Sequence, residues 1–169
     1  MRIAGLVQDS IVDGPGFRFV VFTQGCQQRC EGCHNPATWD INGGEEISVE
    51  KIVAEMLKNP LTDGLTLSGG EPLLQAGECA LLAAAAHESG LNVWVFSGLT
   101  IEELMTRAAN EPEIERFLRQ IDVLVDGAFV AAERTLSLRW RGSKNQRVID
   151  AQKSLAAGKA VEMELGVRS

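Results

Sequence analysis

The chain alternates between short apolar runs and stretches in which apolar side chains recur at helical spacing. A nearly continuous apolar run indicates a strand that is covered on both faces, as the strands of parallel sheets are. Weaker strand candidates are RVI (147–149) and VEMEL (161–165). The four strongest candidates are FRFVVF (17–22), GLTL (64–67), NVWVF (92–96) and DVLV (122–125).

The segments between these runs have the pattern of amphipathic helices. In the first of them, apolar residues recur every three or four positions, which places them on one helix face. Ser48 is the predicted N-cap of this first helix. Gly90 follows the second helix, at the position where a glycine commonly ends a helix. Thr100 and Glu103 fit a capping box at the start of the third helix. The predicted helices cover residues 49–57, 76–89, 101–109 and 113–120, the last after Pro112.

Strands that alternate with helices predict an α/β fold with mostly parallel strands. The chain has 169 residues, which suits one domain with a core of its own. A complete (β/α)8 barrel needs about 250 residues. The sequence therefore predicts a single domain over residues 1–169, built as a partial, open (β/α) barrel.

Composition and charge argue against several classes of protein. The net charge of −7 does not suit a broad electrostatic contact with nucleic acid. No apolar run approaches the ~18–20 residues of a membrane span. The N-terminal sequence MRIAGLVQDS lacks a basic region followed by a long apolar stretch, so we expect no secretory signal and a cytoplasmic location.

The basic residues are unevenly distributed. Five of them fall within residues 134–147, and this stretch is either an ordinary solvated loop or a surface that docks a partner. The pattern alone leaves both interpretations open. The five residues are Arg134, Arg139, Arg141, Lys144 and Arg147.

Polar or glycine-rich residues follow each of the four strongest strands. The first strand is followed by three cysteines, the second by SGGEP (68–72), the third by Ser97-Gly98 and the fourth by Asp126-Gly127. Parallel α/β folds build their ligand sites at the carboxyl ends of the strands. The sequence therefore predicts that a metal centre and a polar ligand lie side by side at one edge of the sheet.

The cysteines Cys26, Cys30 and Cys33 have the spacing C-x3-C-x2-C. One interpretation is a zinc site completed by His34 or Cys79. His34 is adjacent to Cys33, which makes shared coordination of one tetrahedral ion awkward, and Cys79 lies in a helical pattern that suits a buried apolar residue. An iron–sulfur cluster held by three thiolates, with one iron free, fits the spacing better.

The other motifs are ambiguous when taken alone. SGGEP is either a simple turn or a loop whose glycines let the backbone approach a ligand closely. Asp126 either caps a turn or faces a ligand, and Asn145 with Gln146 is either a surface turn or part of a site. The cysteine triplet nearby favours the functional interpretation of SGGEP.

Taken together, these motifs resemble the radical S-adenosylmethionine (SAM) superfamily. DGPGFR (13–18), TQGC (23–26) and GCHNPATW (32–39) resemble its organic-radical-activating branch. VLVDGAF (123–129) and LRWRGSKNQRVID (138–150) resemble the activating proteins of anaerobic ribonucleoside-triphosphate reductase. The resemblance covers about residues 9 to 150, nearly the whole chain.

The resemblance implies an oxidoreductase with a defined chemistry. In that superfamily three cysteines hold a [4Fe-4S] cluster, and the amino and carboxylate groups of SAM occupy the remaining iron. An electron from an external one-electron reductant cleaves SAM into methionine and a 5′-deoxyadenosyl radical. The implied partner is the anaerobic ribonucleoside-triphosphate reductase, on which this radical generates a glycyl radical.

The resemblance also implies roles for individual residues. Cys26, Cys30 and Cys33 are the expected cluster ligands. Glu71 is expected to accept a hydrogen bond from the SAM ammonium group or from a backbone amide of the motif. Asn145 and Arg147 are expected to contact either SAM or the glycine loop of the partner. The full set of expected SAM-site residues is Ser68, Gly69, Gly70, Glu71, Ser97, Asp126, Asn145, Arg147 and His34.

One residue departs from the superfamily pattern. Gly32 stands where many members carry an aromatic residue near the adenine of SAM, so the apolar support of the adenine is unassigned, with His34 as one candidate. Other functions also remain open: activation of a different glycyl-radical enzyme, a reaction like that of 7-carboxy-7-deazaguanine synthase, or a non-catalytic zinc or ferredoxin-like module. The segment RGSKNQR (141–147) argues against the first two.

Overall fold

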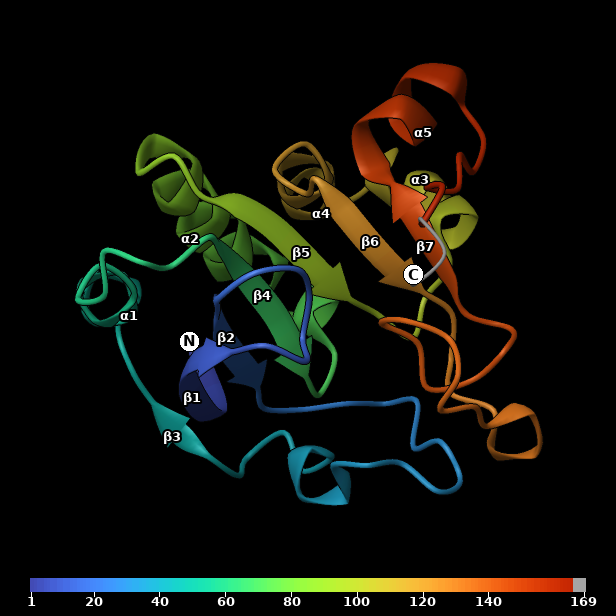
Figure 1. The fold of residues 1–169 in the computed structure, drawn as a ribbon, viewed down its shortest axis with the longest axis horizontal. Helices are drawn as coiled ribbons and strands as arrows, with labels where there is room; N and C mark the ends of the chain where they lie inside the picture. The colour runs from blue at the N-terminus through green and yellow to red at the C-terminus, as the bar shows by residue number, and fades with distance from the viewer. Residues whose placement is uncertain (166–169) are drawn as a thin grey trace.

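A seven-stranded sheet forms the centre of residues 1–165, the part of the chain that the structure, a computed structural model, describes (Figure 1). The strands follow the order β3-β1-β2-β4-β5-β6-β7 across the sheet. Their bounds are β1 (Arg2–Ser10), β2 (Arg18–Thr23), β3 (Glu45–Glu46), β4 (Gly64–Gly69), β5 (Asn92–Phe96), β6 (Val123–Asp126) and β7 (Arg147–Asp150).

The four central strands, β2, β4, β5 and β6, run parallel to one another. The outer strands β1, β3 and β7 run antiparallel to their neighbours. The predicted α/β class with parallel central strands is therefore confirmed. The sheet is open, because the strands at its two ends, β3 and β7, do not pair with each other. Its description as part of a (β/α) barrel stays a prediction.

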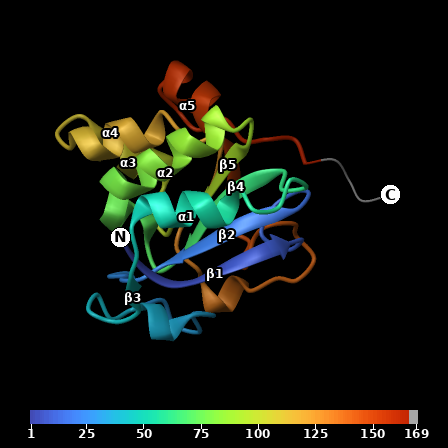
Figure 2. The same ribbon diagram turned by 90° about the vertical axis from the view of Figure 1, so that its left-hand side faces the viewer.

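Successive strand residues point to opposite faces of the sheet. Phe19, Leu65 and Val93 belong to the main core, to which all five helices of residues 1–165 contribute side chains. Figure 2 shows the helices gathered on this one side of the sheet. The helices are α1 (Val49–Met56), α2 (Ala76–Glu88), α3 (Ile101–Ala108), α4 (Pro112–Leu118) and α5 (Ala151–Ala157).

The opposite face carries a smaller apolar cluster and a buried cation. Trp94, Val125 and Val148 belong to this cluster. Arg18 is completely buried and donates hydrogen bonds to Thr66 Oγ1 (3.0 Å) and Leu65 O (2.7 Å). Burial lowers the pKa of Arg18 to about 10, so the guanidinium stays charged at neutral pH. Thr66 Oγ1 in turn donates to Asp13 O (2.8 Å), and these contacts fix the segment before β2 against the sheet.

The local signals at the helix ends are confirmed. The Ser48 hydroxyl accepts a hydrogen bond from Lys51 N (3.3 Å) at the start of α1. Thr100 and Glu103 form the predicted capping box of α3. Gly90 follows α2 with a φ of +77°, a left-handed conformation that glycine adopts without strain.

Three elements were not predicted. β1 and β3 pair antiparallel at the edge of the sheet. Seven of the nine residues of β1 are intermediate or exposed, so these strands lack the continuous apolar run that predicts a buried strand. The short helix α5 begins at the N-cap Asp150, whose carboxylate accepts from Lys153 N (3.0 Å). The segment 161–165, predicted as a weak strand, forms one isolated bridge between Ile149 and Glu162.

An ionic contact at the end of α2 makes stability depend on pH. His87 Nε2 lies 2.8 Å from Asp122 Oδ2, and its Nδ1 lies 3.0 Å from Gln120 Oε1. Burial alone would lower the pKa of His87, but the hydrogen bonds with Asp122 and Gln120 outweigh it and raise the pKa. The imidazolium therefore stabilises the fold fully below pH ~6.5, the pKa of an unfolded histidine, and this contribution is lost as the pH rises through the folded pKa.

We expect the unfolding free energy of the wild type to fall by about 0.3–0.5 kcal/mol between pH 6 and pH 8 relative to a His87→Gln variant. The effect is small because about a third of the imidazole is exposed to water. Urea unfolding at the two pH values measures it, with His34→Gln as the control for the only other histidine. An equal pH dependence in wild type and His87→Gln would contradict the assignment.

Candidate functional site

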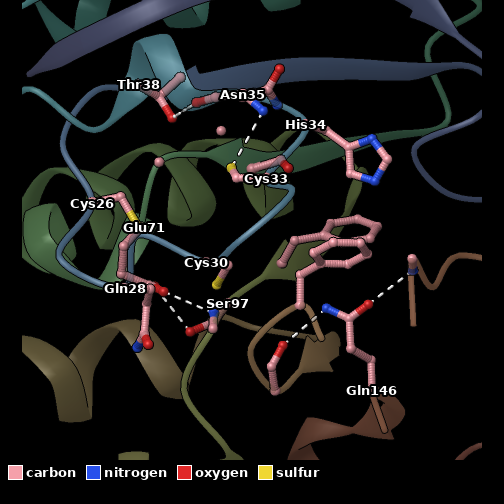
Figure 3. A pocket seen from close by; sticks show the side chains of 18 of the residues that line it. Cys26, Gln28, Cys30, Cys33, His34, Asn35, Thr38, Glu71, Ser97 and Gln146 are labelled. Atoms are coloured by element: carbon pink, nitrogen blue, oxygen red, sulfur yellow. Dashed lines mark hydrogen bonds between the residues drawn. The ribbon is translucent and has the colours of Figure 1, made fainter. Parts of the chain in front are cut away.

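The carboxyl ends of the four parallel strands meet at one edge of the sheet, and the loops that follow them enclose a cavity of about 210 Å³ (Figure 3). The cysteine loop comes from β2, the SGGEP segment from β4, Ser97-Gly98 from β5 and Gly127 from β6. In Figure 1 the arrowheads of β4, β5 and β6 point toward this edge. The structure thus brings together the strand ends that the sequence singled out.

Backbone hydrogen bonds fix the cysteine loop to the residues that follow it and to the end of β4. Gly25 N donates to Thr38 O (2.7 Å), and Cys26 N donates to Trp39 O (3.3 Å). Glu71 N donates to Gly25 O (2.8 Å), which ties the loop to the end of β4. Gly25 has a φ of +100°, a conformation that residues with a side chain rarely adopt. The loop is therefore held by contacts that do not involve its thiols.

The thiols of Cys26, Cys30 and Cys33 are free, half-buried and line the same cavity. Burial raises the pKa of the Cys26 thiol, and backbone hydrogen bonds from residues 28 and 29 oppose this rise. Asn35 N donates to Cys33 Sγ (3.4 Å), as Figure 3 shows. Such N–H donors stabilise sulfur ligands and tune iron–sulfur centres.

This donor set fits an iron–sulfur cluster better than a single ion. Within residues 1–165, no three His, Cys, Asp or Glu side chains are grouped as ligands of one metal ion. In a [4Fe-4S] cluster each thiolate binds a different iron, so the thiols do not need to converge on one point. The fourth thiol, Cys79, is completely buried in α2, and its sulfur lies 3.5 Å from Pro72 O. Three thiols therefore face the cavity, one fewer than the irons of such a cluster.

Glu71 joins two of the loops that surround the cavity. Its side chain is 4% exposed. Its Oε1 accepts from Leu73 N (3.1 Å) and Ser97 Oγ (2.9 Å), and its Oε2 accepts from Gly98 N (2.8 Å). Burial raises the pKa of Glu71, and these three donors oppose the rise. All three donors lie outside the SGGEP motif: Leu73 directly follows it, and Ser97 and Gly98 belong to the loop after β5.

Ser68, Gly69, Gly70 and Ser97, which lie at the ends of β4 and β5, also line the cavity. A Cβ at Gly70 would lie 2.3 Å from Gly25 O, so only glycine allows the two loops to approach this closely. Ser97 donates to Glu71 and accepts from Leu99 N (3.0 Å). Its hydroxyl is therefore engaged within the protein.

Asp126, Asn145 and Arg147 lie beside the cavity and are not among the residues that line it. The buried Asp126 carboxylate accepts from Ile101 N (2.8 Å) and from Arg147 Nε (3.0 Å). Arg147 also pairs with Glu102 (2.7 Å), and its hydrogen bonds with the two carboxylates raise its pKa. Asp126 and Arg147 thus join β6, β7 and α3, whereas Asn145 donates to Ala128 O within the loop between β6 and β7 (2.8 Å).

Phe129 lines the cavity beside Gly32, a position that sequence reasoning did not assign. A Cβ at Gly32 would lie 3.5 Å from the Phe129 ring. His34, which is exposed, meets the same ring edge-to-face at a centroid distance of 5.2 Å. The signal for Phe129 was its place three residues beyond Asp126, in the loop after a predicted strand. Gln146, for which the sequence left a surface turn and a site residue open, also lines the cavity. Lining residues without a predicted role include Gln28, Asn35, Phe96, Trp140 and Gly142.

Known proteins share these features. Residues 12–149 match a family described as a 4Fe-4S single cluster domain. The anaerobic ribonucleoside-triphosphate reductase-activating protein of Escherichia coli (strain K12) is 37% identical over 148 residues, which cover 82% of this chain and 91% of that protein. The chain belongs to the family of anaerobic ribonucleoside-triphosphate reductase-activating proteins.

Other reductase-activating proteins match over similar lengths. The Vibrio cholerae protein is 35% identical over 144 residues (80% of this chain, 89% of that protein). The protein of Enterobacteria phage T4 is 34% identical over 143 residues (81% and 86%). The resemblance seen in the sequence is confirmed, and the family description supports an iron–sulfur cluster. In residues 1–165, no helix has the length and apolar character that crossing a membrane requires.

Proposed function

We propose that this chain is a radical SAM activase that generates a glycyl radical on an anaerobic ribonucleoside-triphosphate reductase. The observation that carries the proposal is the single cavity lined both by three free thiols and by the SGGEP segment. The names of the relatives support the partner, because each is an activating protein of that reductase. A cytoplasmic single domain with a partial (β/α) barrel is part of the same proposal.

Cys26, Cys30 and Cys33 would hold three irons of a [4Fe-4S] cluster, and the fourth iron would be free for the amino and carboxylate groups of SAM. When bound, this cluster supplies one low-potential electron, received from an external reductant, for the reductive cleavage of SAM. The donor count agrees with this assignment, because Cys79 is buried away from the cavity. The coordination position on the fourth iron would therefore be filled by SAM and not by a protein side chain.

The chain itself binds and orients the ligand and excludes water. The backbone at Ser68, Gly69 and Gly70 lies at the cavity surface, where the methionine part of SAM would approach it closely. Glu71 fixes this segment relative to the β5 loop through its bonds to Ser97 and Gly98. Apolar walls limit the access of water to a reactive radical. No side chain is required as a general base, because a carbon radical abstracts the hydrogen atom.

Phe129 is the residue we assign to the adenine. It stands beside Gly32, where the superfamily's usual aromatic side chain is missing, and it lines the same cavity. Stacking of a base on an aromatic ring contributes about 1–3 kcal/mol. Phe129 thus takes the role that the sequence left unassigned and for which His34 was one candidate.

A Phe129→Ala variant is therefore expected to bind SAM about tenfold more weakly, a loss within the range for one stacked base. Titration of the cluster-loaded protein with SAM measures the dissociation constant. Phe129→Trp keeps an aromatic surface and is expected to stay within about threefold of the wild type. Equal affinity in the alanine variant would remove Phe129 from the SAM site.

The proposed function is tested by electron paramagnetic resonance of the anaerobically reconstituted, reduced protein. A [4Fe-4S] signal that changes shape when SAM is added supports an iron open to SAM. Addition of the reductase should then produce a glycyl radical together with 5′-deoxyadenosine. A signal that ignores SAM contradicts the mechanism, and SAM cleavage without a glycyl radical contradicts the partner.

A further inference from the structure

Residues 127–146 join β6 to β7 and are hereafter the basic loop. The loop carries four basic side chains and the single acidic residue Glu133, a net charge of +3 within a chain of net charge −7. Among residues 1–165, none of the four cations forms an ion pair with a carboxylate. The basic residues are Arg134, Arg139, Arg141 and Lys144.

The basic loop is braced internally. Thr135 N donates to Gly142 O (3.0 Å), and Lys144 N donates to Glu133 O (2.9 Å). These bonds join the outgoing and returning halves of the loop. At its base the predicted site residue Asn145 donates to Ala128 O (2.8 Å), and the neighbouring Gln146 donates to Gly127 O (2.9 Å). A loop held in this way presents its side chains with little loss of conformational entropy on binding.

The outer part of the basic loop exposes an apolar side chain among its cations. Leu136 is 91% exposed, the highest value among the large apolar residues of the described chain. Arg134 and Arg139 flank it in sequence, and both are exposed. An apolar residue surrounded by arginines is a composition that favours protein interfaces.

The same loop forms one wall of the cavity. Phe129, Trp140, Gly142 and Gln146 all line it, and in Figure 1 the loop lies at the carboxyl edge of the sheet, next to the cysteine loop. A protein that delivers a segment into this cavity must therefore contact the basic loop. An electron donor has no such requirement, because it delivers no polypeptide segment.

We propose that the basic loop docks the reductase through an acidic surface of that protein, with Leu136 seated in an apolar recess and the cations around it. This inference rests on the proposed function. Opposite charges steer the encounter and fix its orientation, so the association should weaken with salt. The rest of the chain is acidic and repels nucleic acid, which disfavours a polyanion as the ligand.

The test uses the whole cluster-loaded protein and the reductase from the same source. The variant Arg134→Glu/Arg139→Glu/Lys144→Glu is expected to raise the reductase concentration for half-maximal glycyl-radical formation by at least tenfold at about 50 mM salt. Its formation of 5′-deoxyadenosine with dithionite in the absence of reductase should stay within about twofold of the wild type. Leu136→Ser should raise the half-maximal concentration severalfold without altering the salt dependence.

A matched control reverses three cations on the helical side, Lys51→Glu/Lys58→Glu/Arg116→Glu, and should leave the half-maximal concentration unchanged. The proposal is overturned if the basic-loop variant has the half-maximal reductase concentration of the wild type. It is also overturned if the control variant raises this concentration as much as the basic-loop variant does. It is also overturned if the basic-loop variant activates the reductase normally but accepts electrons more slowly from a protein electron donor. The same holds if the only property it loses is binding to duplex DNA. Failure of the proposed function is distinct, since the wild type itself would then either not cleave SAM or form no glycyl radical on the reductase.

Discussion

Replacement of Cys30 by alanine is expected to abolish assembly of the cluster. Each thiolate would bind a separate iron, and within residues 1–165 the only other cysteine, Cys79, is buried in α2 and does not line the cavity. The remaining thiols, Cys26 and Cys33, would leave two irons of the cluster without a protein ligand. Iron and sulfide analysis after reconstitution should therefore give less than about a tenth of the wild-type content, with no detectable cleavage of SAM.

Cys79→Ala is the matched control for this experiment. It removes a thiol of the same chemistry from a site where the sulfur contacts Pro72 O rather than the cavity. This variant should keep its full iron and sulfide content, with only a modest loss of stability from the small change in volume. Full iron content in Cys30→Ala, or loss of iron in Cys79→Ala, would refute the assignment of the ligands.

The second large effect is expected for Glu71→Ala. The substitution removes the acceptor of Leu73 N, Ser97 Oγ and Gly98 N at a position that is 4% exposed. Buried donors left unpaired cost about 1–3 kcal/mol each. Gly98 N is only part-buried at the cavity and can bond to water instead. The two buried donors therefore lead us to expect the unfolding free energy to fall by about 2–6 kcal/mol. Because the β4 and β5 loops lose their connection, the dissociation constant for SAM should rise at least tenfold. Chemical denaturation and SAM titration measure the two effects.

Glu71→Gln separates the charge from the hydrogen bonds. The amide oxygen can still accept from Leu73 N and Ser97 Oγ, whereas the amide NH2 would face Gly98 N, which is itself a donor. The glutamine variant should therefore lie between the wild type and Glu71→Ala in both measurements. Stability and SAM affinity like those of the wild type in Glu71→Ala would show that the network does not organise the site.

The central elements of the fold were predictable because their residues bury in a regular pattern. The predicted strand 64–67 extends to Gly69 in β4, since Ser68 and Gly69 continue the register with Phe22 and Thr23 of β2. The helix α5 was missed because its position depends on the packing of Ala151 in the core. Local periodicity contains no information about such a contact.

Some features of the candidate site could likewise be predicted from local sequence, and others could not. The cysteine triplet and SGGEP could be selected because their chemistry lies in local spacing. The environments of Ser97, Asp126 and Arg147 could not be predicted, since each depends on a partner more than twenty positions away. Phe129 was missed because its place beside Gly32 exists only after β2 and β6 have been brought to the same edge of the sheet.

The backbone anchors of the cysteine loop bear on how the protein matures in the cell. Gly25 N, Cys26 N and Glu71 N form their hydrogen bonds without help from any thiol. A zinc finger folds only when its metal binds, whereas here the polypeptide can reach its native shape first. Iron delivery would then be a late step of biogenesis, and iron-starved cells would accumulate a folded, protease-resistant apoprotein that is ready for repair rather than for degradation.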